Sequence, residues 1–293
     1  MANLKEVRER ISSVVTTQQI TKAMKLVAAS KLKRAQDSIT QMRPYSQVLS
    51  NMLENVMANL EGAELDLSLN RAVDHPKRGL LIVMTSDRGL CGAFNANLIK
   101  KAKEVMASNS DIRYDILPVG KKAFEFAQRE EADVVDSYWT SFASIEFEGA
   151  AAIAEFAING FSEGTYDEVK VVFSEFVNAA TQKIEAVQYL PVSMDNEESD
   201  DASSTSADYI FEPNQAELLN ILIPKILRTT MFRFMLDTNA SEHGARMVAM
   251  EQATENANEL LRDLKLQYNR ERQAAITNEI LEIVGGAAAL EEG

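Results

Sequence analysis

The C-terminal part of the chain contains a run of sixty residues, Lys225 to Val284, with one glycine and no proline. The run is rich in Ala, Leu, Met, Glu, Arg and Gln, which have the highest intrinsic helix propensities. At 1.5 Å per residue, a helix of sixty residues extends roughly 90 Å. One small domain cannot cover a helix of that length. The helix must therefore pair with another element or reach something beyond the chain.

Residues 3 to about 60 read as a second long helix. Asn3, with Glu6 three places on, is predicted to form a capping box. An apolar stripe follows at the three- and four-residue spacing of a helix, formed by Leu4, Val7, Ile11 and Val14. Pro44 is expected to introduce a kink or a step.

The two terminal helices can pair only if they run antiparallel, because the segment between them returns the chain to where it left. We predict the seam on the C-terminal helix from a 3-4-3-4 spacing: Met250, Ala253, Ala257, Leu260 and Leu264. After Leu264 the heptad pattern decays. There the helix is expected to extend beyond its partner and to face something else.

The middle of the chain alternates between strand and helix patterns. Short apolar or β-branched runs predict strands at Gly79–Thr85, Asp111–Val119 and Asp133–Tyr138, and helices are expected to Ser108, over Lys121–Glu130 and over Ser144–Asn159. Glu168–Val177 and Lys183–Val192 predict a hairpin closed by Asn178–Gln182. This alternation indicates an α/β sheet with an antiparallel edge.

The predicted fold class is therefore α/β plus a long antiparallel coiled coil, with a Rossmann-like α/β domain inserted between the paired terminal helices. The expected boundaries are 1–60 for the N-terminal coiled-coil helix, 61–78 for a linker, 79–194 for the α/β domain, 195–211 for an acidic mobile loop and 212–293 for the C-terminal coiled-coil helix. Asn214 and Glu217 are expected to cap the last helix, and Pro224 to kink it.

Charge is unevenly distributed along the chain. The net charge is −14, which argues against general nucleic-acid binding. Residues 1–43 nevertheless hold nine Lys and Arg against three acidic residues, a local net charge of +6. Three readings stay open for this basic stripe: a solvated helix face, a nucleic-acid patch, or a surface for an acidic partner.

Composition excludes several classes of site. Two histidines and one cysteine argue against a multi-ligand metal centre or a disulfide framework. No uncharged apolar run approaches the length of a membrane span, and neither a secretory signal nor a transit peptide is expected.

The candidate chemical motifs are weak. Ser86–Gly92 lies between a predicted strand and helix, where phosphate often binds, but it matches no phosphate-loop or dinucleotide pattern, and a tight turn is favoured. Gly160–Gly164 matches the residue pattern of a nucleophile elbow but not its structural context. That motif requires a strand before it and a helix after it, whereas here a helix precedes and a strand follows. Cys91 is expected to be a small buried residue, and His75 and His243 to be surface or capping residues. We predict no catalytic, cofactor-binding or metal-binding residue.

Three separated motifs carry a family resemblance. Ser241–Ala257 and Arg272–Ala287, including Ile276-Thr-x-Glu279-x-x-Glu282-x-x-x-Gly286-Ala287, resemble the C-terminal region of gamma subunits of F-type ATP synthase. The N-terminal Ile11–Lys31 and the central Ser86–Asn95 resemble two further motifs of that family. Their order and spacing agree across essentially the whole chain.

This resemblance implies a rotor shaft of bacterial type, not itself an enzyme. The paired helices would turn inside a ring of three alpha and three beta subunits, and the α/β domain would rest with epsilon on the membrane ring of c subunits. Ion flow would turn the ring, and the shaft would couple rotation to ATP synthesis at alpha/beta sites. The expected location is the cytoplasmic face of the cell membrane, peripheral, with one copy per complex.

Partner contacts follow from the same resemblance. The expected contacts with beta are Met24, Lys25, Arg246, Arg272, Gln273 and Thr277, and those with the c ring or epsilon are Tyr209 and Glu212. The chain lacks the inserted cysteine pair of chloroplast gamma subunits, so thiol regulation is not expected. The alternative is an enzymatic or small-ligand-binding α/β domain whose helices serve oligomerisation, with Ser86–Gly92 as its best support.

Overall fold

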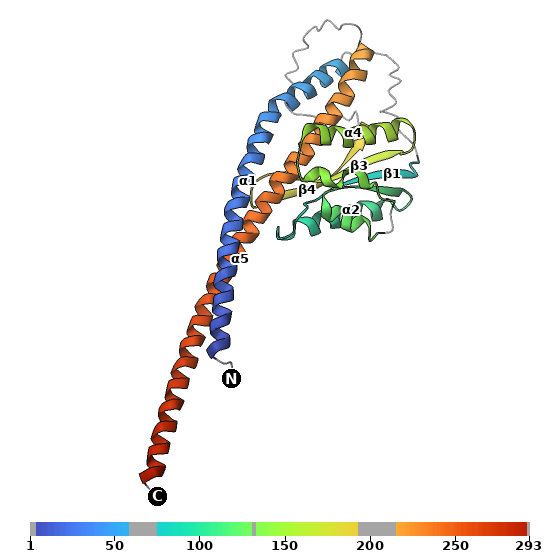
Figure 1. Ribbon diagram of the computed structural model, residues 1–293. Helices are drawn as coiled ribbons and strands as arrows, with labels where there is room; N and C mark the ends of the chain where they lie inside the picture. The colour runs from blue at the N-terminus through green and yellow to red at the C-terminus, as the bar shows by residue number, and fades with distance from the viewer. Residues whose placement is uncertain (1–3, 59–74, 131–132, 193–214, 292–293) are drawn as a thin grey trace. The chain divides into compact units, whose positions relative to one another are not determined.

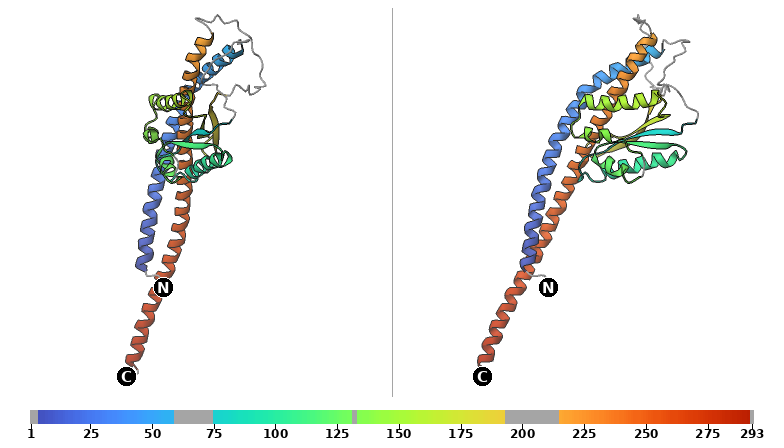
Figure 2. Two further views of the ribbon diagram at one scale, coloured as in Figure 1. Left: turned by 90° about the vertical axis from the view of Figure 1, so that its right-hand side faces the viewer. Right: turned by 45° about the vertical axis from the view of Figure 1, so that its right-hand side comes forward.

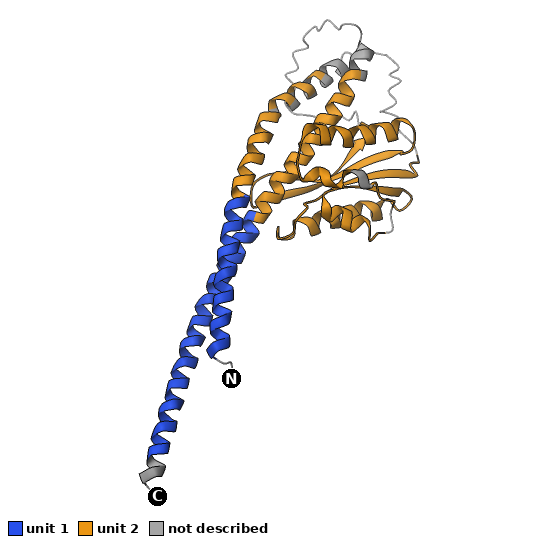
Figure 3. Ribbon diagram, viewed as in Figure 1, with its two compact units in different colours: residues 1–28, 247–293 blue, residues 29–246 orange. Residues whose placement is uncertain are grey.

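The computed structural model describes residues 4–58, 75–130, 133–192 and 215–291 (Figure 1). Contacts divide the chain into two compact units, residues 1–28 with 247–293, and residues 29–246 (Figure 3). Each unit is described by itself. The helices are α1 (Leu4–Ala58), α2 (Phe94–Ser108), α3 (Lys121–Ala127), the 3-10 helix η2 (Asp136–Phe142), α4 (Phe147–Ser162) and α5 (Gln215–Glu291).

The larger unit is built on a four-stranded sheet in the order β2-β1-β3-β4. Its strands are β1 (Arg78–Met84), β2 (Arg113–Val119), β3 (Glu168–Phe176) and β4 (Gln182–Leu190). β1 pairs in parallel with β2 and β3, whereas β3 and β4 are antiparallel. The predicted hairpin and the antiparallel edge are therefore confirmed.

Alternating side chains of β1 separate two apolar layers, as the two-residue period of a strand requires. Leu80 and Ile82 face α4 and the segment of α5 around Met231. Leu81 and Val83 face α2 and α3. Figure 2 shows α4 on one side of the sheet and α2 on the other. A sheet buried on both faces explains why β1 reads as a continuous apolar run rather than an alternating one.

The third predicted strand, Asp133–Tyr138, is wrong. Only one parallel bridge forms there, between Val134 and Ile116, and the chain then enters η2. The Trp139 carbonyl accepts a hydrogen bond from the Gly120 N–H at 2.9 Å, and the Trp139 ring stacks on Phe124 with ring centroids 5.3 Å apart. These contacts turn the chain back toward α3, so the strand cannot continue.

The two long terminal helices are confirmed. α1 is continuous through Pro44, and Figure 1 shows it bending toward its C-terminal end. α5 is continuous through Pro224. The predicted caps at Asn3 and Asn214, most of the 61–78 linker and the acidic loop 195–211 lie outside the described residues.

The seam of the smaller unit differs from the prediction at two of its five positions, each shifted by one residue. The buried residues on α5 are Met250, Ala257, Leu261 and Leu264, whereas Leu260 is 39% exposed. Ala253 and Thr254 are both half-buried. The predicted 3-4-3-4 spacing placed Leu260 in the seam, but Met250, Thr254, Ala257, Leu261 and Leu264 follow each other at 4-3-4-3. Both spacings average 3.5 residues, so periodicity alone does not distinguish them.

Candidate functional site

The loop Ser86–Gly92 folds onto itself after β1. The Ser86 N–H donates to Asn95 Oδ1 at 3.0 Å, and the Ser86 hydroxyl donates to the Arg88 carbonyl at 2.7 Å. Asn95 Nδ2 lies 3.2 Å from the sulfur of Cys91. Ser86 is fully buried and Cys91 is 2% exposed, so the prediction of a small buried cysteine is confirmed. The polar groups of Ser86 and Asn95 are used inside the loop, which fits a tight turn rather than a ligand cradle.

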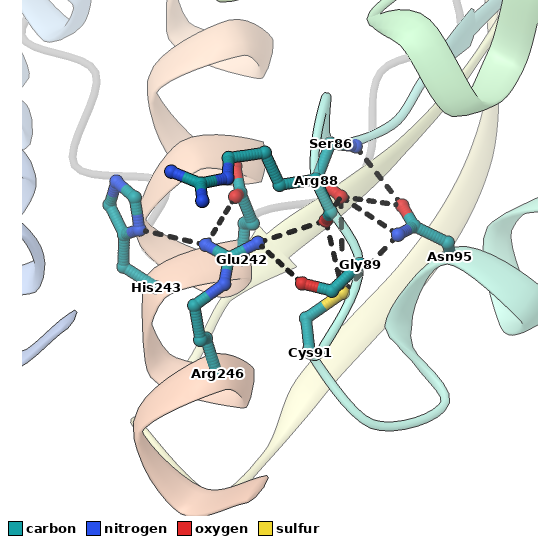
Figure 4. Close-up of polar contacts among 8 residues, drawn as sticks. All are labelled: Ser86, Arg88, Gly89, Cys91, Asn95, Glu242, His243 and Arg246. Atoms are coloured by element: carbon teal, nitrogen blue, oxygen red, sulfur yellow. Dashed lines mark hydrogen bonds and ion pairs between the residues drawn. The ribbon is translucent and has the colours of Figure 1, made fainter. Parts of the chain in front are cut away.

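Arg246 of helix α5 reaches the tip of this loop (Figure 4). Its Nη2 donates to the carbonyl of Arg88 at 3.0 Å and to that of Gly89 at 3.4 Å. Its Nη1 donates to Glu242 one turn earlier on the same helix, at 2.5 Å. The side chains of Arg246 and Glu242 are only 12% and 8% exposed. The guanidinium therefore joins a helix turn to a loop more than 150 residues away in sequence.

Burial shifts the pKa values of two ionisable groups in this cluster, Glu242 and His243. Desolvation raises the pKa of the Glu242 carboxyl, and the neighbouring Arg246 guanidinium opposes that rise. Desolvation also lowers the pKa of His243 to about 4, aided by the positive charges of Arg246 and Lys31. His243 is half-buried rather than on the surface, and it stays neutral near pH 7. His75, by contrast, is exposed, as predicted.

The coiled coil of the smaller unit has a polar middle section. Gln18 Nε2 donates to Asn258 Oδ1, and the hydroxyls of Thr21 and Thr254 lie 2.8 Å apart. Lys25 forms an ion pair with Glu251, with 37% and 46% of the two side chains exposed. From one pair to the next, the residue number on α1 rises by three or four while the residue number on α5 falls by three or four. The two helices are therefore paired in an antiparallel register.

Continuing this register by one heptad pairs Val14 with Leu261 and Ile11 with Leu264. The same register sets Leu4, the first described residue of α1, opposite Glu271. From 272 to 287 every residue of α5 is exposed. These residues include Ile276, Ile280, Leu281, Ile283 and Val284, which are 45% to 67% exposed. The decay of the seam after Leu264 is thus followed by an apolar helix end without a partner among the described residues.

The predicted beta-contact residues fall into separate places. Met24 and Lys25 are half-buried on α1, and Arg272, Gln273 and Thr277 are exposed on α5. Arg272 lies 21 residues beyond Glu251, the ion-pair partner of Lys25, which is about 30 Å along a helix. Arg246 belongs to the larger unit. Tyr209 and Glu212 lie outside the described residues.

Two negative findings hold for the part of the chain that the structure describes. No group of three or more His, Cys, Asp or Glu side chains is placed to hold a metal ion. None of the described helices has the length and apolar character that crossing a membrane requires.

Comparison with known proteins gives one consistent family. The model of the ATP synthase family matches residues 3–290. The chain is 47% identical to the ATP synthase gamma chain of Cytophaga hutchinsonii, over 99% of each chain. It is 46% identical to the ATP synthase gamma chain of Desulforamulus reducens, over 99% of this chain and 100% of that one.

Two solved structures share the fold. A chain of the Tetrahymena thermophila mitochondrial ATP synthase, from its central stalk and c ring, superposes with a TM-score of 0.56 and 25% identity, covering 80% of this chain and 99% of that one. A chain of the Euglena gracilis mitochondrial ATP synthase gives a TM-score of 0.66 at 21% identity, covering 99% and 95%.

Proposed function

The chain belongs to the ATP synthase family, in which its curated relatives are gamma chains, and from this premise we infer that it is the central rotor shaft of an F1Fo ATP synthase. As such a shaft it couples rotation of the c ring to the conformational cycle of the catalytic sites between alpha and beta subunits. The chain carries no catalysis of its own.

The observation that carries this proposal is the unpartnered end of α5. From Arg272 onward the helix leaves its partner α1, and its exposed Ile, Leu and Val side chains, which at 3.6 residues per turn fall within roughly 160° of the helix circumference, form one broad apolar face. An apolar helix in water needs a partner that covers it. In the proposed complex, the surrounding alpha and beta subunits provide that cover.

The coiled coil suits transmission of rotation. Two helices wound together resist bending and twisting better than one, and the small side chain of Ala257 in the seam permits close approach of the backbones. The rotor is asymmetric because only α5 continues beyond the paired section. An asymmetric shaft inside three alpha/beta pairs places the three catalytic sites in three different states.

We propose two groups of contacts with the beta subunit. Met24 and Lys25 form a collar on the basic N-terminal helix, facing an acidic segment of beta. Lys25 is paired with Glu251 but remains 37% exposed, so it is still within reach of a partner carboxylate. Arg272, Gln273 and Thr277 form the distal group, which lies fully exposed on the unpartnered part of α5.

Three further contacts have different support. Arg246 stays in the proposed beta-contact set, although its guanidinium faces loop 86–92 within this chain. Tyr209 and Glu212 remain proposed contacts with the c ring or epsilon on the family resemblance alone.

The shaft is a peripheral part of a membrane complex. We propose that it works at the cytoplasmic face of a bacterial cell membrane, in one copy per complex. The described helices contain no membrane span, so the chain reaches the membrane through epsilon and the c ring.

A reconstitution tests the proposal. ATP hydrolysis is measured for this chain alone, for the alpha and beta subunits of the same organism alone, and for the mixture, together with the native mass of each sample. We expect activity to rise steeply on mixing, in a complex with one copy of this chain per three alpha and three beta subunits. Activity in the chain alone, or failure to associate, would contradict the shaft.

A further inference from the structure

The tip of loop 86–92 is held by a side chain from the opposite end of the sequence. Arg246 Nη2 approaches two successive carbonyls of the loop, Arg88 at 3.0 Å and Gly89 at 3.4 Å. The base of the loop is held elsewhere. The Ser86 and Asn95 side chains bond within ten residues of themselves, and the Asp87 carboxylate and the Ser86 carbonyl accept hydrogen bonds from the backbone N–H groups of Lys121 and Lys122 at the start of α3, at 2.9 and 3.2 Å. Arg246 therefore provides the bond that ties the loop tip to helix α5 (Figure 4).

Arg246 is itself fixed in place. Its Nη1 is paired with Glu242, and both side chains are almost completely buried. A buried charge without its partner is costly, so each member of the pair restrains the other. The planar guanidinium directs one nitrogen to the carboxylate and the other to the loop. A lysine ammonium is a single point of charge and does not reproduce this fork.

The loop tip beyond the clamp is exposed and constrained. Leu90 is 65% exposed and adopts a positive φ of 64°, which is uncommon for a residue with a branched side chain. Such a conformation persists only where surrounding contacts hold it. The bonds from Arg246 to the two preceding carbonyls are contacts of that kind.

We propose that Arg246 is a positioning residue that locks loop 86–92 to helix α5, so that the loop tip and the helix turn as one piece. The lock is a property of this chain alone. Its consequence, that the loop tip follows the rotation of the shaft without lag, rests on the proposed function. Arg246 thus acts through the loop that it holds.

The chain carries its own reporter for this lock. Cys91 is the only cysteine, it is 2% exposed, and its sulfur lies beneath the loop, 3.9 Å from the Arg88 carbonyl. A thiol reagent reaches it only when the loop opens. When opening and closing are fast, the labelling rate measures the fraction of molecules with an open loop.

The experiment compares labelling of Cys91 by the aromatic disulfide DTNB in the isolated full chain and in three variants. We expect Arg246→Ala to accelerate labelling on the order of tenfold or more, because it removes hydrogen bonds from a charged donor. Arg246→Lys should lie between that variant and the wild type. Arg228→Ala is the matched control, because Arg228 also pairs from α5 with a carboxylate of the α/β body, Glu155 at 3.2 Å, and does not touch the loop.

The outcomes separate clearly. Far-UV circular dichroism identifies any variant that has unfolded, and if Arg246→Ala does so, the comparison of Arg246→Lys with Arg228→Ala decides. Labelling at the wild-type rate in both Arg246 variants would overturn the assignment. Equal acceleration in Arg228→Ala would also overturn it, because any lost ion pair on α5 would then open the loop.

The consequence for rotation is tested in the reconstituted complex. If the wild-type chain fails to stimulate ATP hydrolysis by alpha and beta, the proposed function fails while the labelling result stands. If the wild type stimulates hydrolysis and the Arg246 variants label like the wild type, only the lock fails.

Discussion

Replacing Leu261 by alanine should weaken the coiled coil far more than the same change at its neighbour Leu260. Leu261 is 7% exposed in the seam, whereas Leu260 is 39% exposed. Truncating a buried leucine to alanine costs about 2–5 kcal/mol, and a two-helix seam that can close around the gap belongs near the lower end. We therefore expect a loss of about 2 kcal/mol for Leu261→Ala and less than about 1 kcal/mol for Leu260→Ala.

Hydrogen exchange measures this difference locally, which matters because the chain has two compact units and need not unfold in one step. A loss of about 2 kcal/mol raises the exchange rate of protected amides by about thirtyfold. Peptides from residues 4–28 and 250–268 should show this in Leu261→Ala, while peptides from the sheet stay unchanged. Equal or greater deprotection in Leu260→Ala would refute the 4-3-4-3 seam and restore the 3-4-3-4 spacing.

Three further predictions concern coupling, the sheet and pH. Arg272→Ala and Gln273→Ala should each reduce ATP-driven proton pumping by the reconstituted enzyme more than Lys25→Ala does. The reason is that a hydrogen bond with a charged group contributes roughly 1.5–3 kcal/mol, whereas an exposed ion pair contributes about 0–1 kcal/mol. Wild-type pumping in both distal variants, or a tenfold loss in Lys25→Ala, would contradict the two groups of contacts. Gly120→Ala should lower the free energy of unfolding of the α/β body, measured by urea denaturation, by about 3 kcal/mol or more. The reason is that Gly120 has a φ of 102° and that a Cβ there would lie 2.1 Å from a backbone carbonyl oxygen. A loss below about 1 kcal/mol would contradict this. The pKa of His243 is lowered to about 4, so its neutral form stabilises the fold fully above pH 6.5, and that contribution is lost as the pH falls toward 4. His243→Gln should therefore lose less stability than the wild type between those pH values, and identical pH profiles would contradict the burial of a neutral imidazole.

The sequence by itself determined the elements that depend on local patterns. Helix propensity over Lys225–Val284 and the apolar stripe from Leu4 specify the two long helices, because these signals repeat over many turns. The strands at Gly79–Thr85 and Glu168–Val177 were predictable for a similar reason, since short apolar runs between turn residues have few other uses. The motifs at both ends and in the centre indicated the family.

Local sequence patterns did not predict the structure in two situations. In one, two residue spacings have the same average period; in the other, a contact with a residue distant in sequence determines the local conformation. Leu260 and Leu261 both satisfy a repeat of 3.5 residues, and only pairing with α1 selects Leu261. Asp133–Tyr138 has strand-like residues, but the contacts of Trp139 with Gly120 and Phe124 turn it into a single bridge followed by a 3-10 helix.

The site shows the same division. The exposed positions of Arg272, Gln273 and Thr277 follow from the decay of the heptad after Leu264, which the sequence records. The role of Arg246 does not, because its partners Arg88 and Gly89 lie more than 150 residues earlier and are joined to it through backbone carbonyls. Backbone carbonyls are identical in every residue, so no sequence pattern marks which of them a distant guanidinium will find. Only the packing of α5 against the sheet decides that contact.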